Sequence, residues 1–482
     1  MTRFTRGSIA LIVAALSVTA GCLPRQLVVW SPDGSRAVVM TQKETYVCDG
    51  DGKLAKTNLG VATAAAWMSD SRRVVLAVNQ TAEKWADLVP ALDEPTRRAI
   101  IAIADELDKK ILQTPTGKKL PEEQAEAITK ATFEGKENLM PAVLLYLCDH
   151  RAEAVKKYYG DEWEDLRKVS VTYSRLSVCR LDGMSLKPDC VLLNSLKGIQ
   201  EVRLSPGGKR VAMVTPSDRA EQADALWAHT LWVAEIAAKA TPVEVADIIG
   251  LFPDWSPDGK LVYLQAAGMK DDKPIGIGML CSRGVVDADG NQPKPQQLAM
   301  TSFDPSQTVR CLPDGRIVFT SAELSIPAAS HDTAQSRVFV YAPDEEPKVK
   351  PLLIDEAAEE LAGMSILALG PDGKTVCVSN GSKVAVVSLA NGKLTWVQRE
   401  TKNAGMLPSW RKAGELCFLK APGKDDGEDA RDEVALWSNG KVRTISKDWP
   451  DEVMENLTFA PKKKPMLTTS MPATQPATRP GD

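Results

Sequence analysis

Apolar and polar residues alternate along most of the chain, in short runs that end at turns rich in Pro, Asp and Gly. Two stretches show the pattern clearly: WSPDGSRAVV from Trp30 to Val39, and WSPDGKLVYL from Trp255 to Leu264. Proline presets φ at the first corner of such a turn, Asp bonds the local backbone, and Gly supplies a positive φ. Each stretch therefore predicts an antiparallel hairpin with a bulky aromatic residue where the first strand meets the turn.

The same unit recurs through the sequence. SPGG after Leu204, LPDG after Cys311 and GPDG after Leu369 keep most of the turn. The copies at Trp67 and Trp410 have the aromatic residue but lack the proline. A last, degraded copy, called here the Phe459 echo, has APKK after Phe459 and lacks the glycine. A second alternating strand follows, as in residues 384–392, and then a short outer strand. Units of four strands with an aromatic residue at a recurring position are typical of β-propeller blades.

The spacing of the turns indicates one interrupted unit. The turns lie near residues 31, 69, 205, 256, 312, 370, 411 and 460, and all intervals but one have the length of a blade, roughly 40–60 residues. The exception is 205 − 69 = 136 residues. It contains residues 80–168, where apolar positions recur at helical spacing in three segments, 91–113, 121–131 and 141–159. We expect a helical insertion within the second blade.

The repeated aromatic–SPDGK–strand motif resembles the TolB-like, WD-repeat-like propellers of bacterial envelope proteins over most of residues 27–463. The resemblance implies an all-β fold, and seven full units predict seven blades. The Phe459 echo is interpreted as a strand that closes the ring; an eighth blade is the alternative. Propellers of this kind act as binding platforms, and related blades occur in enzymes, so the resemblance does not settle the activity.

Blade geometry predicts where the long connections lie. Strands A to D run from the axis outward, so the A–B turns share one face, the turn face. The B–C connections lie on the opposite face, the long-loop face. Five B–C connections are long: the helical insertion and residues 215–230, 268–277, 321–337 and 423–433. Variable loops on a rigid scaffold are common binding sites, so we expect a cell-envelope protein or a small ligand to bind there. Tolerated insertions without a ligand are the alternative.

Both ends of the sequence read as lying outside the propeller. A basic start and an apolar run predict a signal peptide over residues 1–21, too short to span a bilayer. TAGC at residues 19–22 resembles the lipobox of bacterial lipoproteins, with Thr19 where Leu is usual. This resemblance implies lipidation of Cys22, a short linker over 22–26, and anchoring in the bacterial cell envelope, facing the periplasm or the exterior. A plain signal peptide with an incidental Cys is the alternative. Residues 464–482 are rich in Pro and Thr and are expected to be disordered.

Charge and cysteine content narrow the function classes. The chain has 59 Lys+Arg against 63 Asp+Glu, a balance that argues against nucleic-acid binding. The cysteines other than Cys22 fall mostly in apolar strands, where free thiols pack as small hydrophobes. Cys179 and Cys190 flank a turn and are the pair to test for a disulfide. We expect a monomer.

No catalytic, cofactor or metal site emerges from the residue inventory. There is no G-x-S-x-G motif, and His150, His229 and His331 lack spaced partners for a metal. Cys148, Asp149 and His150 are adjacent on a helix and point in different directions. Residues 287–291 begin like a calcium loop but lack the required Gly and Glu, so they predict a hairpin turn.

Two functions remain from different classes. The first is a membrane-tethered, non-catalytic lipoprotein that binds a protein or ligand. The second is an exported enzyme, for example a carbohydrate-active one, with acidic residues that converge at the channel mouth. Paired carboxylates on the long-loop face would favour the enzyme.

Overall fold

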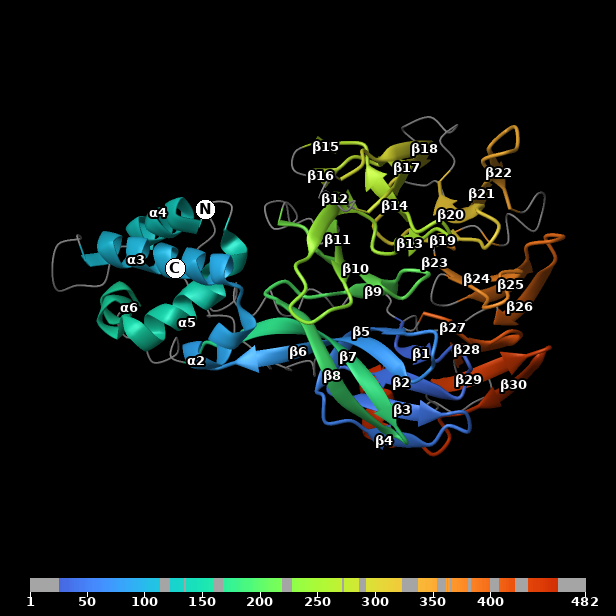
Figure 1. Ribbon diagram of the computed structural model, residues 1–482, viewed down its shortest axis with the longest axis horizontal. Helices are drawn as coiled ribbons and strands as arrows, with labels where there is room; N and C mark the ends of the chain where they lie inside the picture. Colours follow the sequence, from blue (N-terminus) through green and yellow to red (C-terminus); the bar gives the residue numbers. More distant parts are fainter. Residues whose placement is uncertain are drawn as a thin grey trace, which may run out of the picture.

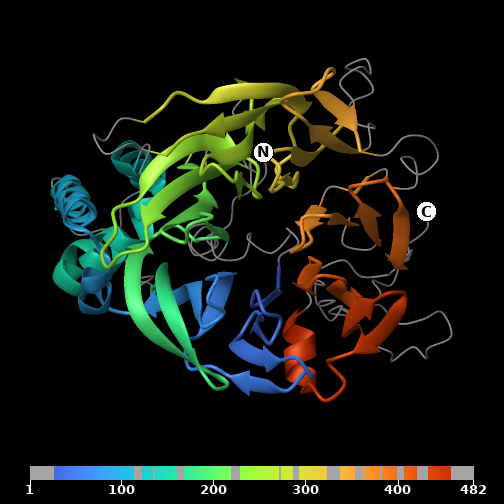
Figure 2. The same cartoon turned by 45° about the vertical axis from the view of Figure 1, so that its right-hand side comes forward.

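The protein is a β-propeller with a helical insertion. The computed structural model describes residues 26–112, 122–133, 136–159, 168–218, 228–270, 273–285, 292–322, 337–352, 361, 363–364, 366–379, 383–398, 407–420 and 432–457. In this part of the chain, four-stranded antiparallel groups follow one another around a central axis in sequence order (Figure 2). The strand order within each group is A, B, C, D, so the all-β propeller predicted from the repeats is confirmed.

The described strands are grouped here into blades one to seven, four strands to a blade (Figure 1). Blades three and four share one eight-stranded sheet, because Ile249 of blade three pairs with Gln265 of blade four. Blade one holds β1 (Val28–Trp30), β2 (Arg36–Met40), β3 (Thr45–Asp49) and β4 (Leu54–Lys56); blade two holds β5 (Val61–Trp67), β6 (Arg73–Ala82), β7 (Val171–Asp182) and β8 (Ser185–Ser195). Blade three holds β9 (Glu201–Leu204), β10 (Arg210–Pro216), β11 (His229–Glu235) and β12 (Val243–Ile249); blade four holds β13 (Asp254–Trp255), β14 (Leu261–Ala266), β17 (Ile277–Arg283) and β18 (Gln296–Ser302). Blade five holds β19 (Val309–Cys311), β20 (Ile317–Ser321), β21 (Arg337–Tyr341) and β22 (Val349–Pro351). Blade six holds β23 (Ile366–Leu369), β24 (Thr375–Ser379), β25 (Val384–Ser388) and β26 (Leu394–Gln398); blade seven holds β27 (Ser409–Lys412), β28 (Glu415–Lys420), β29 (Glu433–Ser438) and β30 (Lys441–Thr444).

Burial is greatest in the second strands of the blades and least in the outermost strands, and this explains the apolar runs in the sequence. The second strand of a blade is covered on both faces by neighbouring blades, so β20 is buried at every position and β14 at its first four. Such strands need continuous apolar residues rather than alternation. The outermost strands are short and exposed, as β22 and β30 show.

The repeated turn has the geometry that its residues predict. At the first copy, Gly34 has φ +69°, and Asp33 Oδ1 accepts hydrogen bonds from Ser31 Oγ at 2.6 Å and from the Ser35 backbone N–H at 3.0 Å. At the copy in blade four, Gly259 has φ +80° and its N–H donates to Ser256 O at 2.9 Å. The polar groups of the turn therefore form hydrogen bonds within the turn itself, so the same turn can form in different blades whatever surrounds it.

The aromatic residue before the turn joins neighbouring blades. Trp67 Nε1 donates to Val29 O of blade one at 2.9 Å, and Trp255 Nε1 donates to Arg203 O of blade three at 3.1 Å. Trp410 Nε1 donates in the same way to Ala368 O of blade six at 2.8 Å. Trp30, Trp67 and Trp255 are buried, whereas Trp410 is only half-buried. The rings of Trp30, Trp67 and Trp255 therefore belong to the core of the propeller.

The second blade carries the helices between its B and C strands. These helices are α2 (Trp85–Leu88), α3 (Glu94–Leu112), α4 (Glu122–Phe133), α5 (Met140–His150) and α6 (Ala152–Tyr159), with short 3-10 turns η2 (Val89–Ala91) and η3 (Glu137–Leu139). One long helix was expected over 141–159, and that expectation is wrong at Arg151. There the backbone leaves the helical region (φ −137°, ψ 41°), and the turn lets both α5 and α6 contact α3.

One strand flanking the insertion is longer than the sequence pattern predicts. The insertion was expected to begin at residue 80, but β6 continues to Ala82, which pairs with Val171 of β7. Strand pairing through backbone bonds continues here without the apolar alternation that marks a strand in sequence. The insertion between the paired ends is therefore residues 83–170, slightly shorter than the predicted 80–168.

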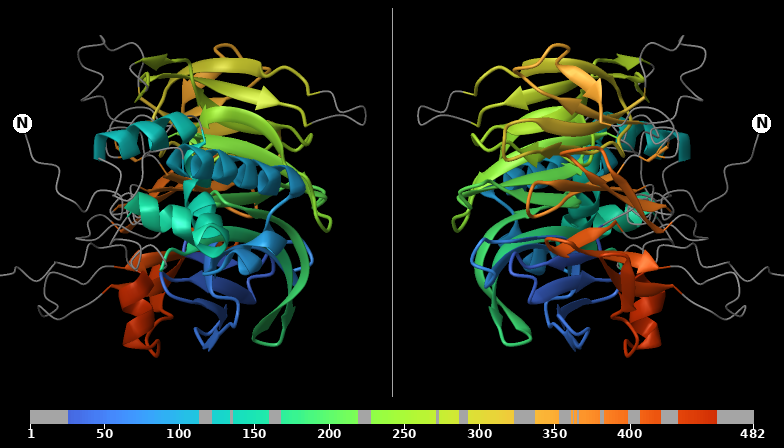
Figure 3. Two further views of the ribbon diagram at one scale, coloured as in Figure 1. Left: turned by 90° about the vertical axis from the view of Figure 1, so that its left-hand side faces the viewer. Right: turned by 90° about the vertical axis from the view of Figure 1, so that its right-hand side faces the viewer.

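The ring closes where blade seven meets blade one. Helix α10 (Asp451–Leu457) follows the last strand and lies against blade one (Figures 2 and 3). Trp449 Nε1 donates to Gly52 O at 2.7 Å, and Arg411 Nε donates to Gly34 O at 2.9 Å. One apolar cluster spans the seam, from Leu27 to Leu457. The Phe459 echo, expected to be a closing strand, lies outside the described residues.

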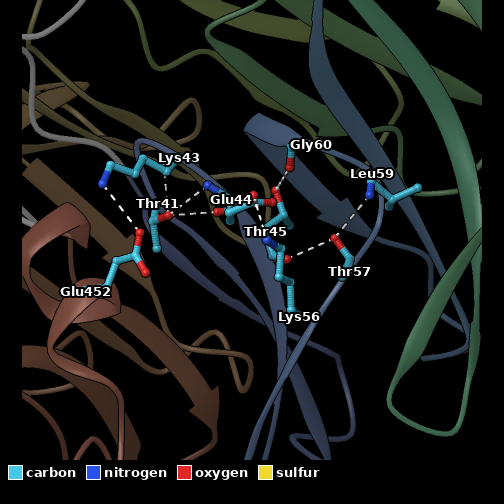
Figure 4. Close-up of polar contacts among 9 residues, drawn as sticks. All are labelled: Thr41, Lys43, Glu44, Thr45, Lys56, Thr57, Leu59, Gly60 and Glu452. Carbon is cyan, nitrogen blue, oxygen red and sulfur yellow. Dashed lines mark hydrogen bonds and ion pairs between the residues drawn. The ribbon is translucent and has the colours of Figure 1, made fainter.

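Polar contacts hold the blade-one side of this seam in place (Figure 4). Thr41 Oγ1 accepts the backbone N–H of Glu44 at 3.0 Å, which fixes the loop between β2 and β3. From that loop, Lys43 Nζ reaches Glu452 Oε1 of α10 at 3.4 Å. Thr45 Oγ1 donates to Gly60 O at 2.7 Å, which ties blade one to blade two.

The eight cysteines of the described residues are free thiols, as the sequence indicated for most of them. Cys179 and Cys190 do not form a disulfide. Cys179 is buried, and desolvation, with a smaller effect of the nearby Asp189 carboxylate, raises the pKa of its thiol to about 12. The six buried thiols act as apolar core groups, whereas those of Cys148 and Cys190 are half-buried.

Candidate functional site

The insertion leaves the ring at the long-loop face. The turn from Trp67 to Arg73 lies at one end of β6, and the helices follow its other end, after Ala82 (Figure 1). The remaining B–C connections begin and end at the same level of their own blades. Residues 217–228, 322–336 and 421–432 occupy these connections, and most of them lie outside the described residues. In blade four the connection contains a small hairpin of β15 (Met269–Lys270) and β16 (Lys273–Pro274).

The insertion has a hydrophobic core of its own. Ile100, Ala104 and Leu107 of α3 pack with Val143 and Leu147 of α5. Trp85 contacts Tyr146 edge-on, with ring centroids 5.0 Å apart. Blade two joins this cluster through Ala82, Val171 and Tyr173 at the ends of β6 and β7, and through Leu196 after β8. The helices thus form a compact unit on one blade, with an apolar cluster separate from those between the blades.

The histidine-containing segment of the insertion has a structural role. Asp149 Oδ2 accepts the backbone N–H of Trp85 at 2.7 Å, which fixes the start of α2. The His150 ring stacks on Tyr146 with centroids 4.6 Å apart. His229 is buried at the start of β11, and His331 lies outside the described residues. Among the residues that the structure describes, no three His, Cys, Asp or Glu side chains are grouped to hold a metal ion.

A second candidate site lies at the axis of the ring. A cavity of about 240 Å³ is lined by residues of the inner strands. Its charged lining consists of Arg203, Asp254 and Arg310, from blades three, four and five. Its apolar lining comes from blades six and seven and includes Ile366, Leu369, Leu407 and Trp410. The cavity is therefore polar on one side and apolar on the other.

The two arginines on the charged side of the cavity differ in their partners: Arg203 has a carboxylate partner, whereas Arg310 bonds a backbone carbonyl. Arg203 Nε lies 2.8 Å from Glu201 Oε1. Asp254 accepts two backbone N–H groups at 3.0 Å, from Trp255 at Oδ1 and from Cys311 at Oδ2. Arg310 is only 6% exposed, and its Nη1 donates to Val309 O at 2.6 Å. Burial, with the neighbouring Arg203 guanidinium, lowers the pKa of Arg310 to about 10, so it carries its charge at neutral pH.

Sequence reasoning did not find this cavity. Arg203 and Arg310 each lie two residues before a repeated turn, at Ser205 and Leu312, so a usable signal existed. A charged residue two positions before that turn sits on the innermost strand and lines the axial cavity, whereas the equivalent positions of blades one and six carry Val29 and Ala368. The predicted lipidation site, Cys22, lies outside the described residues.

No helix of the described residues combines the length and apolar character that crossing a membrane requires. No protein-family description and no curated protein matches this chain. Solved structures similar to it include TolB from Acinetobacter baumannii (18% identity over 55% of this chain and 57% of that chain, TM-score 0.36). They also include the Cps50 (Swd1) β-propeller domain of Myceliophteria thermophila (10% identity, 86% and 96%, TM-score 0.44) and a putative TolB from Agrobacterium tumefaciens (14%, 53% and 83%, TM-score 0.36).

This chain thus spans little more than half the length of the Acinetobacter protein. At these identities and TM-scores, the fold assignment rests on the sheet topology of the chain itself.

Proposed function

We propose that this protein is a membrane-tethered, non-catalytic propeller of the bacterial cell envelope that binds a protein partner through its long-loop face. The observation that carries this proposal is the helical insertion. It has a core separate from those of the blades and joins the ring through two paired strand ends. A unit that the ring does not need for folding is well suited to contact something else.

The tether is proposed from the sequence TAGC at residues 19–22. Replacing the anchor, Cys22→Ser, is expected to move the protein from the membrane fraction to the soluble fraction, because no acyl chain can then be attached. Fractionation and mass spectrometry of the N-terminal peptide measure this. Cys190→Ser, at a half-buried thiol elsewhere, is the matched control. Membrane retention of Cys22→Ser without lipid on the peptide would contradict the proposal.

The partner site is tested by removing the insertion. Deleting residues 83–170 and joining Ala82 to Val171 by a two-residue turn is expected to abolish capture of envelope proteins by the purified protein, as measured by cross-linking and mass spectrometry. The control is Lys187→Glu, an exposed change on the same blade at the turn-face end, near Asp182. Capture that survives the deletion, or that is lost equally in the control, would place the partner site elsewhere.

The non-catalytic part of the proposal is supported by the carboxylates around the cavity. A glycosidase needs two carboxyl groups free for acid–base work. Here Glu201 is paired with Arg203, and each oxygen of Asp254 accepts a backbone N–H. The described carboxylates at the cavity therefore give the exported enzyme no support, and most residues of the long-loop connections other than the insertion, where that enzyme would need its carboxylate pair, lie outside the described residues.

A further inference from the structure

The charged side of the axial cavity carries an inference that goes beyond partner binding at the long-loop face. Buried charges in proteins are normally paired and hydrogen-bonded. Arg310 is not: within the described parts of the chain, no carboxylate lies at ion-pair distance from it, and its one hydrogen bond goes to the adjacent Val309 carbonyl. A guanidinium has five N–H donors, so the described residues use only a small part of its bonding capacity.

The carboxylates nearest to Arg310 already have other hydrogen-bond or ion-pair partners. Asp254 accepts two backbone N–H groups and Glu201 pairs with Arg203. Arg203 itself lies close enough to Arg310 to lower its pKa. These two guanidinium groups share their wall with the Asp254 carboxylate. Because both Asp254 oxygens already accept backbone N–H groups, the guanidinium donors can still hold an anion between them.

The opposite wall restricts which anion. It is built from Ile366, Leu369 and Leu407, with the half-buried ring of Trp410. A cavity needs roughly 10–15 Å³ to hold one water, so about 240 Å³ admits a ligand of several heavy atoms. A phosphate or sulfate would leave the apolar wall without a contact.

We infer that the axial cavity binds an organic carboxylate, with the carboxylate on Arg310 and Arg203 and an apolar body against Ile366, Leu369 and Trp410. A carboxylate matches a guanidinium through two parallel N–H···O bonds. The group can belong to a free small acid or to the C-terminal residue of a peptide, since both present the same carboxylate and an apolar side.

The test uses the full chain and isothermal titration calorimetry with 3-phenylpropionate. Neutral 3-phenylpropanamide is the control ligand, because it keeps the shape and loses the charge. We expect the acid to bind and the amide to bind about tenfold or more weakly. No binding of the acid up to roughly 10 mM, or equal binding of the amide, would overturn the inference.

Variants assign the binding to the cavity. Arg310→Gln and Arg203→Gln are each expected to weaken acid binding by about tenfold to a hundredfold, and Leu369→Trp to block it by filling the apolar side. Arg316→Gln is the matched control, since Arg316 lies in the turn after β19 and pairs with Asp314. If Arg310→Gln does not fold, as judged by circular dichroism, Arg203→Gln and Leu369→Trp decide. Unchanged binding in these variants would place the site elsewhere.

A peptide pair separates the two sources of the carboxylate. A pentapeptide ending in a free Leu carboxylate is compared with the same peptide amidated at its C-terminus. Binding of the free-carboxylate peptide indicates capture of a chain end, whereas binding of 3-phenylpropionate alone indicates a small acid. Partner capture at the long-loop face is measured separately, so the failure of either proposal leaves the other standing.

Discussion

At the scale of single residues, the tryptophan before the repeated turn has two roles: its ring packs between blades, and its Nε1 forms a hydrogen bond to the neighbouring blade. The Trp255 ring fills space between blades three and four, and its Nε1 bonds Arg203 O. Trp255→Ala is expected to cost about 3–5 kcal/mol of unfolding free energy, and Trp255→Phe, which keeps a ring, about 1 kcal/mol for the lost hydrogen bond. Urea denaturation measures both. A loss near zero in the alanine variant would mean that the ring does not support the core.

A second residue ties stability to pH. His229 is buried at the start of β11, and desolvation lowers the pKa of its imidazole to about 4, although a backbone hydrogen bond with Ile249 opposes this. The ordinary value is 6.5, so the unfolded chain binds the proton first as pH falls. The stability contribution is therefore complete above pH 6.5 and is lost progressively between pH 6.5 and about 4.

The slope from this one group is about 1.4 kcal/mol per pH unit. His229→Leu is expected to flatten the pH dependence of the unfolding free energy in that window, as measured by urea denaturation at several pH values. The control is His150→Leu, which changes a histidine with a partly exposed ring on α5. An equal slope in the wild type and in His229→Leu would contradict the assignment.

At the scale of elements, the turn chemistry and the buried B strands were predictable from the sequence because each is locally determined. The ends of elements were not. β6 extends to Ala82 because its partner β7 is present to pair with it, and the long predicted helix breaks at Arg151 because α6 packs back on α3. Both outcomes depend on contacts between different segments of the chain. The residue pattern within one segment carries no information about those contacts.

The insertion is also an element whose removal has a predictable effect on the ring. Because Ala82 and Val171 already pair, joining them forms an ordinary hairpin, and the blades keep their own cores. The deletion variant described above is therefore expected to keep the far-ultraviolet strand spectrum and a cooperative thermal transition. Loss of that transition would show that the helices belong to the core of the ring.

At the scale of the whole molecule, the seam between blades seven and one depends on close backbone approach. Gly52 has φ +97°, and a Cβ there would overlap the carbonyl of Ile445 in blade seven. Gly183, in a hairpin of blade two, has φ +65° and no atom within 4 Å of the Cβ position. Both glycines have a positive φ that would strain a residue with a Cβ, but only Gly52 has a neighbour that the added Cβ would overlap.

Gly183→Ala is accordingly expected to cost about 1 kcal/mol for its left-handed backbone. Gly52→Ala is expected to cost about 1–3 kcal/mol more, because the seam must shift. Thermal and urea unfolding compare the two, and hydrogen exchange should show loss of protection in β1 and β29 for Gly52→Ala alone. Equal losses in the two variants would mean that the seam tolerates the added methyl group.

The axial cavity also belongs to this scale, and the sequence could not predict it. Arg203, Asp254 and Arg310 come from three blades and meet only because the ring brings the inner strands together. Each residue alone reads as an ordinary strand position next to a turn. The repeat fixes where such residues point, but only the closed ring determines which of them face one another.

The seam has one further consequence. Each blade is built from strands that follow one another in the chain, and no strand of the described residues is exchanged between blades one and seven. Leu27 and Leu457 lie in the same apolar cluster, so a short linker could connect the two ends of the described ring. If the two ends were joined in this way, the chain could be opened between any two blades, and the position of the opening would decide which blade comes first in the sequence. A circular permutant opened between blades six and seven would contain every blade intact and would place a covalent bond where packing now holds the ring together.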